Sequence, residues 1–387
     1  MKNLNGKLVH CFTMVKPMRQ YPSTSPEEKP KRQPHFIYKY LVPRNKQKNN
    51  FWCKLCVCIL ISLKFVCLIM LYYRGGAQSK AIKYMLPNHI KCSSIGLNFG
   101  RNYSHHPDDN TTIFFVETSG KTNPSFLSMC SVESAARAHP GAKIVLLMKG
   151  ISAMKNTQTL GVSLLNCFPN VEIRPLDLEE LFADTPLSLW YSRLRQWWQP
   201  YLIPVMSDAC RLVLMWKYGG IYLDTDIIVL KNLLNLTNCI GREQQYLLNT
   251  AFMAFDRRHG FIGQCLTDFV EHYNGWIWGH QGPQLATRVL KKWCQKTSIT
   301  KIQHCKGVKV LPPEAFYPIH WQDWKKYFEV MSKSEAQKLL DSSYALHIWN
   351  KKSGGTRFQI GSKVMIDQLT SVYCPVSYKI LSWQRNL

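Results

Sequence analysis

From residue 113 onward, apolar residues gather in short runs, and turn residues separate these runs. Three of them, Ile113–Val116, Lys143–Met148 and Val171–Ile173, have the length and composition of strands. Between the first two, Pro124–Ala138 has helical spacing and ends at a His-Pro-Gly stop. Alternating strands and helices with apolar strands are typical of a mostly parallel sheet covered by helices. We therefore predict an α/β catalytic domain over residues 111–387.

A second helix and strand bring two carboxylates together. The pattern predicts a helix over Ser207–Tyr218, a break at the Gly-Gly pair that follows, and a strand over 221–223 that runs into Asp224 and Asp226. Residues two apart in a strand face the same way, so both carboxylates point to one side. Two such groups can hold Mn²⁺ or Mg²⁺ and leave positions for phosphate oxygens. By itself an Asp-x-Asp pair is weak evidence, because a solvated strand end looks the same.

The longest apolar run is Leu55–Tyr73, interrupted only by Ser62 and Lys64. Nineteen helical residues rise about 28 Å, close to the hydrocarbon thickness of a bilayer. A buried core helix is the alternative, but the run is apolar on every face and lacks a polar stripe. No small-residue cleavage site follows it cleanly, which disfavours a cleaved signal peptide. We predict a transmembrane signal anchor over 53–73 and a stem over 74–110.

The charge is distributed unevenly. The whole chain carries a formal net charge of +25, and its first 50 residues hold 11 Lys or Arg but only two acidic residues. The positive-inside rule therefore leaves a basic tail, residues 1–52, in the cytosol and the remaining chain in the lumen of a type II membrane protein. Met14 or Met18 is an alternative start. A nucleic-acid partner is excluded by this compartment, whereas phosphorylated or membrane partners fit the positive charge.

Cysteines and sequons fit a secretory lumen. Nine of the 14 Cys follow the predicted anchor without any Cys-x-x-Cys pair, so disulfides are expected rather than zinc, with at least one thiol left over. Glycosylation sequons begin at Asn102, Asn110 and Asn235.

Seven long stretches of the chain resemble the α-1,4-glycosyltransferases of the secretory pathway, which share a DxD sugar-binding region. The resemblance covers about residues 113–380 and rests on these matches: ETSGKTNPSFLSMCSVESAARAHP (117–140), FPN (168–170), LFADTPL (181–187), SDACRLVLMWKYGGIYLDTDIIVLKNL (207–233), HYNGWIWGHQGPQLATRV (272–289), LPPEAFYPIHWQDWKKYF (311–328) and HIWNKKSGGTRF (347–358).

This resemblance implies a GT-A-like nucleotide-sugar-binding domain in the Golgi membrane. It implies a retaining, Mn²⁺-dependent hexosyltransferase that moves galactose from UDP-galactose to lactosylceramide in an α-1,4 linkage, giving globotriaosylceramide. The alternatives are an α-1,4-N-acetylglucosaminyltransferase acting on mucin-type glycans and a non-catalytic, membrane-anchored lectin. Such a protein can also form a homodimer.

The resemblance also suggests roles for individual residues. Asp224 and Asp226 would bind the metal and the diphosphate. Asp208 and Arg211 share a helix face and would lie near the donor sugar, with a surface ion pair as the alternative. The turn after the first strand, Glu117, Thr118 and Ser119, would contact the nucleotide base or ribose, or be a plain βα turn.

Further roles come from the last third of the chain. By analogy, His347 would complete the metal site, although a lone His is more often structural. Gln281 is a candidate for contact with the sugar, and we place it with Asp208 as a catalytic candidate; retention itself permits either a nucleophile or same-face attack. Four tryptophans are expected to form a sugar platform or a lipid-side surface, with core packing as the alternative: Trp276, Trp278, Trp321 and Trp324.

Overall fold

The structure, a computed structural model, describes residues 62–67, 92, 111–152, 159–194 and 198–385. The chain divides into two compact units, Met1–Gln78 and Ser79–Leu387. Of the first unit, residues 62–67 are described and form a helical segment. Among the residues that the structure describes, no helix has both the length and the apolar character needed to cross a membrane. The predicted tail, most of the predicted anchor and nearly all of the predicted stem lie outside the described residues.

The second unit is built on an eight-stranded sheet with the order β3-β2-β1-β4-β7-β6-β9-β8. Its first four strands are parallel, as the apolar runs predict. They are β1 (Thr112–Glu117), β2 (Lys143–Met148), β3 (Val171–Pro175) and β4 (Gly220–Leu223).

The other half of the sheet is mixed. The pairs β4–β7, β6–β7 and β8–β9 are antiparallel, whereas β6 and β9 are parallel. These strands are β6 (Cys239–Gln244), β7 (Leu247–Phe255), β8 (His304–Cys305) and β9 (Val308–Leu311). Four of the seven neighbouring pairs are thus parallel, and the prediction of a mostly parallel sheet is confirmed in that form.

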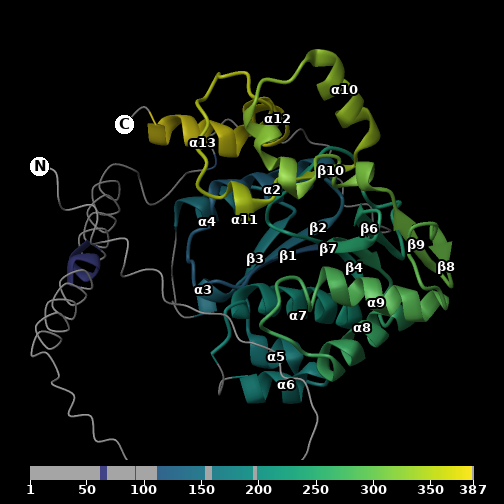
Figure 1. Ribbon diagram of the computed structural model, residues 1–387. Helices are drawn as coiled ribbons and strands as arrows, with labels where there is room; N and C mark the ends of the chain where they lie inside the picture. Colours follow the sequence, from purple (N-terminus) through teal and green to yellow (C-terminus); the bar gives the residue numbers. More distant parts are fainter. Residues whose placement is uncertain (1–61, 68–91, 93–110, 153–158, 195–197, 386–387) are drawn as a thin grey trace, which may run out of the picture. The chain divides into compact units, whose positions relative to one another are not determined.

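Helices cover both faces of the sheet (Figure 1). Successive residues of β1 alternate between the two apolar cores, because strand side chains point to opposite faces in turn. One core packs against α2 (Phe126–Ala138), α4 (Leu160–Leu165), α12 (Met365–Tyr373) and α13 (Pro375–Arg385). The other core packs against α5 (Leu178–Phe182), α6 (Leu187–Leu194), α7 (Leu202–Lys217), α8 (Gly260–Glu271) and α9 (Pro283–Cys294).

A small second sheet ties the C-terminal region to the centre of the domain. It pairs β5 (Ile227–Val229) antiparallel with β10 (Ala345–His347), and His347 lies opposite Ile227. The remaining short elements are α3 (Lys149–Ser152), η3 (Pro313–Ala315), η4 (Trp321–Phe328), α10 (Lys333–Ser342) and α11 (Asn350–Ser353). This pairing carries residues near position 347 to the end of β4.

One buried carboxylate and three disulfides link separate segments of the domain. Glu133 on α2 is fully buried and accepts hydrogen bonds from the backbone N–H groups of Val376 (3.0 Å) and Ser377 (2.7 Å) at the start of α13. Disulfides join Cys92 to Cys167, Cys130 to Cys374, and Cys294 to Cys305.

The expected disulfides are therefore present. Among the described cysteines, Cys67 is exposed and unpaired, and three buried thiols are unpaired: Cys210, Cys239 and Cys265. Of the three sequons, Asn235 is exposed, whereas Asn102 and Asn110 lie outside the described residues.

Candidate metal and donor site

The turn from α7 into β4 positions the Asp-x-Asp pair. Gly219 and Gly220 have φ angles of +68° and +89°, a conformation that residues with a Cβ rarely adopt. A Cβ on Gly220 would also collide with the carbonyl oxygen of Thr112 in β1. Glycine therefore lets β4 lie beside β1, and β4 delivers Asp224 and Asp226 to the carboxyl end of the parallel strands, where ligands of open α/β sheets bind.

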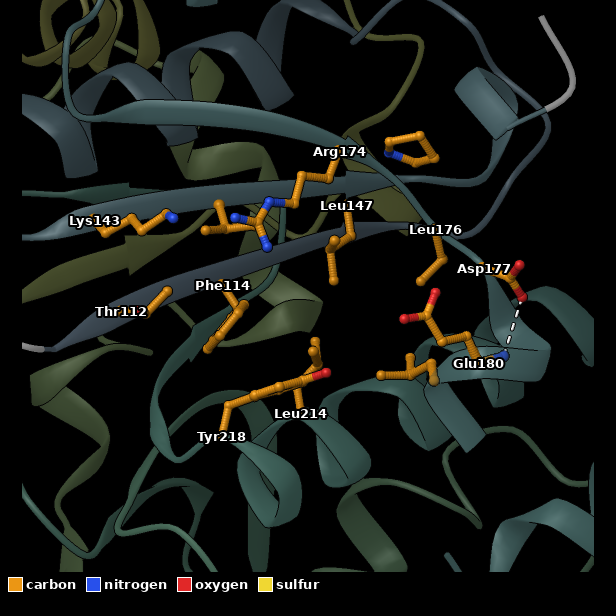
Figure 2. A pocket seen from close by; sticks show the side chains of 13 residues that line it. Thr112, Phe114, Lys143, Leu147, Arg174, Leu176, Asp177, Glu180, Leu214 and Tyr218 are labelled. Carbon is orange, nitrogen blue, oxygen red and sulfur yellow. Dashed lines mark hydrogen bonds between the residues drawn. The ribbon is translucent and has the colours of Figure 1, made fainter. Parts of the chain in front are cut away.

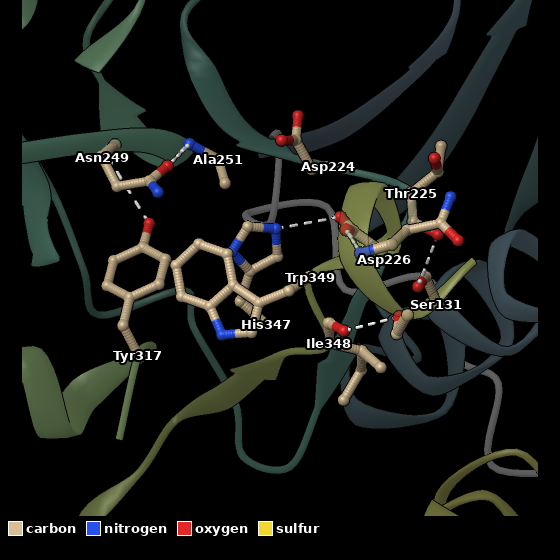
Figure 3. A network of polar contacts seen from close by, with 12 residues as sticks. Ser131, Asp224, Thr225, Asp226, Asn249, Ala251, Tyr317, His347, Ile348 and Trp349 are labelled. Carbon is tan, nitrogen blue, oxygen red and sulfur yellow. Dashed lines mark hydrogen bonds and ion pairs between the residues drawn. The ribbon is translucent and has the colours of Figure 1, made fainter. Parts of the chain in front are cut away.

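The structure brings Asp224, Asp226 and His347 together, with one possible ligand atom of each within 4.8 Å of the others (Figure 3). His347 Nε2 lies 3.1 Å from Asp226 Oδ1, and the Asn350 backbone N–H donates to Asp226 Oδ2 at 2.7 Å. The other ring nitrogen, His347 Nδ1, is buried and has no hydrogen-bond partner among the described residues. Two carboxylates and an imidazole with an unused nitrogen fit a divalent cation such as Mn²⁺.

Arg211 forms a second part of the site, next to Asp224. Its Nη2 lies 2.9 Å from Asp224 Oδ1 and 3.6 Å from Asp208 Oδ1. Ser207 Oγ and Thr250 Oγ1 accept further hydrogen bonds from the same guanidinium, at 3.1 and 3.0 Å. The ion pair between Asp208 and Arg211, which was the alternative expectation, is thus present, but both side chains are buried and Arg211 also contacts Asp224, so the pair is not on an exposed helix surface. Their position near the donor sugar stays a prediction.

Burial and neighbouring charges shift the pKa values of the carboxylates in this cluster in opposite directions. Burial, with a smaller contribution from the Asp224 charge, raises the pKa of Asp208 to about 7 against the opposing effect of Arg211. Burial also raises the pKa of Asp224. The pKa of Asp226 is lowered, because His347 and the Asn350 amide outweigh its burial. Burial opposes protonation of His347, but the Asp226 carboxylate outweighs it and raises the His347 pKa.

The predicted nucleotide turn lies at the end of β1. The Ser119 backbone N–H donates to Glu117 Oε1 at 2.9 Å, and Thr118 Oγ1 donates to the Ile203 carbonyl of α7 at 3.3 Å. Ser119 Oγ is buried and has no hydrogen-bond partner in the described part of the chain. A free hydroxyl here suits a ligand group, and the nucleotide-binding role stays a prediction.

Gln281 was predicted to contact the sugar, which requires an accessible side chain. Its side chain is fully buried. Gln281 Nε2 donates to the Phe269 carbonyl at 2.8 Å, while Oε1 accepts from the Asn274 backbone and lies 2.7 Å from His280 Nδ1. The amide thus fixes the loop between α8 and α9, and its placement gives no support to direct contact with the sugar.

Two polar residues near the carboxylates were not predicted from the sequence. Tyr222 OH donates to Asp224 Oδ1 at 2.7 Å, and the Tyr222 ring lies under the Arg211 guanidinium, 4.9 Å from ring centre to Cζ. Tyr222 lies in β4, two residues before Asp224, which directly follows the strand end at Leu223, so an alternation continued past the strand end could have found it. Asn249, whose Oδ1 accepts from the Ala251 N–H at 2.8 Å, comes from β7 and follows no local motif.

A separate hollow of ≈ 400 Å³ lies between the first three strands and helices α5 and α7 (Figure 2). Cationic Lys143 and Arg174 lie along its strand side, and Asp177 and Glu180 along its α5 side. None of its lining residues belongs to the carboxylate cluster. The hollow is therefore distinct from the candidate metal site.

Comparison with known families matches two regions of the chain. Residues 125–247 match the glycosyltransferase sugar-binding region containing the DXD motif, and residues 254–381 match the alpha 1,4-glycosyltransferase conserved region. Between them, these regions contain Asp208, Arg211, Asp224, Asp226 and His347.

Several curated proteins are similar over most of the chain. The lactosylceramide 4-alpha-galactosyltransferase of Homo sapiens is 54% identical over 334 residues, which cover 85% of this chain and 94% of that protein. Its Mus musculus counterpart is 55% identical over 83% of this chain and 89% of its own length. The alpha-1,4-N-acetylglucosaminyltransferase of Homo sapiens is 37% identical over 70% of this chain and 80% of its own length. Among solved structures, the galactosyltransferase LgtC with donor and acceptor sugar analogs shares 14% identity over 71% of this chain and its whole own length, with a TM-score of 0.37.

Proposed function

Because the chain belongs to the alpha 1,4-glycosyltransferase family, we propose that it is a retaining hexosyltransferase with UDP-galactose as donor and lactosylceramide as acceptor. The product is globotriaosylceramide, formed by an α-1,4 linkage to the terminal galactose. One observation carries the proposal: the Asp224–Asp226–His347 cluster occurs in a chain 54% identical to a lactosylceramide 4-alpha-galactosyltransferase over 94% of that protein. The lower identity to the N-acetylglucosaminyltransferase, 37%, favours galactose as the transferred sugar.

The site residues suit the departure of a nucleoside diphosphate. Asp224, Asp226 and His347 would hold Mn²⁺, which supplies Lewis-acid neutralisation of the diphosphate charge when bound. Arg211 holds Asp224 in place at 2.9 Å, and the Asn350 amide holds Asp226 at 2.7 Å. Preorganised groups of this kind cost no rearrangement during the reaction, so they favour the charged leaving group over the intact donor.

We place the domain in the lumen of the Golgi apparatus, behind a single-pass type II anchor. The apolar run over residues 55–73 and the basic segment before it support this topology. The three disulfides support an oxidising compartment, since such bonds are rare in the cytosol.

A donor and acceptor assay on the detergent-solubilised full chain tests the proposal. UDP-galactose or UDP-N-acetylglucosamine is offered with lactosylceramide, in the presence of Mn²⁺ or EDTA. We expect transfer of galactose that EDTA abolishes and that Asp224→Asn lowers by about 10²–10³-fold, the usual cost of losing one transition-state electrostatic contact. Asp341→Asn on exposed α10 is the matched control and should retain wild-type activity.

Two outcomes contradict the proposal. Transfer of N-acetylglucosamine in preference to galactose would keep the site but overturn the donor. No transfer of either sugar by a chain that binds Mn²⁺ and unfolds cooperatively would overturn the proposed acceptor or the enzymatic function itself.

A further inference from the structure

Five large apolar side chains are exposed together on the surface of the catalytic domain, and we name this set the aromatic rim. Its members and their exposed fractions are Trp198 (77%), Ile203 (57%), Trp276 (61%), Ile277 (47%) and Trp278 (46%). Two chain segments supply them: the approach to and first turn of α7, and the loop between α8 and α9.

Ring contacts join the two segments of the aromatic rim. Trp198 lies against Trp276 with ring centres 5.7 Å apart, and Tyr201 lies against Trp278 at 5.5 Å. Folded soluble domains rarely leave contiguous apolar surface exposed to water. Where they do, the surface usually binds a protein, a ligand or a membrane.

Three contacts place the aromatic rim at the edge of the candidate site. The Ile203 carbonyl accepts a hydrogen bond from Thr118 in the predicted nucleotide turn. The loop that carries Trp276 and Trp278 continues to Gly282, which lies against the Asp208 carboxylate. On the other side, Lys351 Nζ lies 5.2 Å from the Trp278 ring centre, and Lys351 directly follows Asn350, which holds Asp226. A surface in contact with the rim would therefore border the donor site.

The chemistry of the rim favours a lipid surface over a sugar. Indole rings prefer the boundary between water and hydrocarbon, where one edge is apolar and the other is wet. Ile203 and Ile277 add purely aliphatic surface, and Lys351 beside Trp278 suits anionic headgroups. The rings meet edge to face, at 70° for Trp198 with Trp276 and 78° for Tyr201 with Trp278, so they do not form one flat stacking surface for a sugar.

We propose that the aromatic rim docks on the lipid surface in which the acceptor is embedded, and so presents the acceptor's sugar headgroup to the carboxylate site. This inference rests on the proposed function, because it takes the acceptor to be a glycolipid. It assigns to Trp276, Ile277 and Trp278 the role of holding the site at the membrane surface. These residues would raise the effective concentration of embedded acceptor without contacting the reacting sugar.

A comparison of embedded and soluble acceptors tests the role of the rim. The full chain is reconstituted in phosphatidylcholine vesicles containing 20% phosphatidylserine, and galactose transfer is measured to lactosylceramide in the same vesicles and to methyl lactoside in solution. For Trp276→Ser/Ile277→Ser we expect KM for lactosylceramide to rise about tenfold, equivalent to about 1.4 kcal/mol. The kinetic constants for methyl lactoside should stay within twofold of wild type.

The matched control removes one aromatic and one aliphatic side chain elsewhere on the surface that are at least as exposed as Trp276 and Ile277. Tyr246 in the turn between β6 and β7 is 64% exposed and Val372 on α12 is 66% exposed, so Tyr246→Ser/Val372→Ser should leave both acceptors unaffected. An equal rise of KM for both acceptors in the rim variant would make the rim a sugar platform and overturn the proposal. Unchanged kinetics with both acceptors would overturn it as well.

A second measurement does not depend on turnover. Vesicles of brominated phosphatidylcholine quench tryptophans that enter the lipid, and the fluorescence difference between wild type and Trp276→Tyr isolates position 276. Quenching of this difference signal supports docking, and its absence contradicts docking. If wild type transfers galactose to neither acceptor, the proposed function fails while the quenching experiment still decides whether the rim contacts lipid.

Discussion

Replacement of Gly282 by alanine tests the contact between the loop before α9 and the carboxylate site. A Cβ at position 282 would lie 2.7 Å from Asp208 Cγ and 2.8 Å from Asp208 Oδ2. Ordinary carbon contacts are about 3.5–4.0 Å, so the loop or the Asp208 carboxylate must move by about 1 Å. Carboxylate and loop are both held by other contacts, since Asp208 lies 3.6 Å from Arg211 and the Gln281 amide is bonded on both sides.

The displacement should reach Asp224 through Arg211. Arg211 Nη2 lies between the two carboxylates, 2.9 Å from Asp224 Oδ1, so a shifted Asp208 changes the position of the guanidinium that orients Asp224. A misplacement of about 1 Å near reacting groups can cost about 100-fold in rate. We therefore expect kcat to fall about 100-fold, equivalent to about 2.7 kcal/mol in activation free energy. The free energy of unfolding should fall by about 1–3 kcal/mol, as for other overpacked sites.

Initial rates of galactose transfer at saturating UDP-galactose and urea unfolding curves measure both effects. Gly120→Ala is the matched control, because a Cβ at Gly120 would meet no atom within 4 Å. Wild-type kcat in Gly282→Ala would refute the coupling from loop to Asp224. An equal loss of kcat in Gly120→Ala would also refute it, because the effect would then not depend on the Asp208 contact.

Four further predictions concern stability and metal binding. Glu133→Gln should lower the free energy of unfolding by about 2–3 kcal/mol in thermal or urea melts, because the buried carboxylate accepts two backbone N–H groups of α13; an unchanged melt would contradict this role. Mn²⁺ affinity measured by calorimetry should rise with pH from 6.5 upward, because the raised pKa of His347 makes protons compete with the cation, and a flat profile would exclude His347 as a ligand. Over the same window the metal-free protein should lose stability, since the charged His347–Asp226 pair stabilises the fold below the ordinary His pKa and is lost as pH rises through the raised one. Removal of the Cys130–Cys374 disulfide by Ser substitution should cost about 2–5 kcal/mol, measured by non-reducing melts, and a wild-type melting temperature would contradict that expectation.

The parallel half of the sheet was predictable because its strands are short apolar runs between turn residues, a local signal. The first turn of α7 was missed: the helix begins at Leu202 rather than at Ser207. Pro204 lies in that first turn, where proline fits because the N–H it lacks would be unpaired anyway. The mixed half of the sheet depends on pairings such as β6 with β9, which joins residues about 70 positions apart and leaves no mark in the local pattern.

The candidate site divides in the same way. Asp224 and Asp226 were found from the Asp-x-Asp motif after an apolar strand, but β4 ends at Leu223 and both carboxylates lie in the turn before β5, so the expected strand alternation is not what brings them together. His347 came from the family resemblance, since its contact with Asp226 spans 121 positions and depends on the β5–β10 pairing. The four tryptophans show the limit of the pattern most clearly. Trp276 and Trp278 are exposed, but Trp321 and Trp324 pack against the apolar core, a difference that the type of residue alone cannot reveal.

The linkage of the product made from UDP-galactose and lactosylceramide decides whether the chain has the proposed α-1,4-galactosyltransferase activity. The full chain is incubated with both substrates and Mn²⁺, and the purified trisaccharide lipid is analysed by NMR and by digestion with α- and β-galactosidases. We expect one new α-linked galactose on O4 of the terminal galactose, removed only by the α-galactosidase and absent when EDTA replaces Mn²⁺. A β-linked product, attachment at another hydroxyl, or undiminished transfer in EDTA would contradict it.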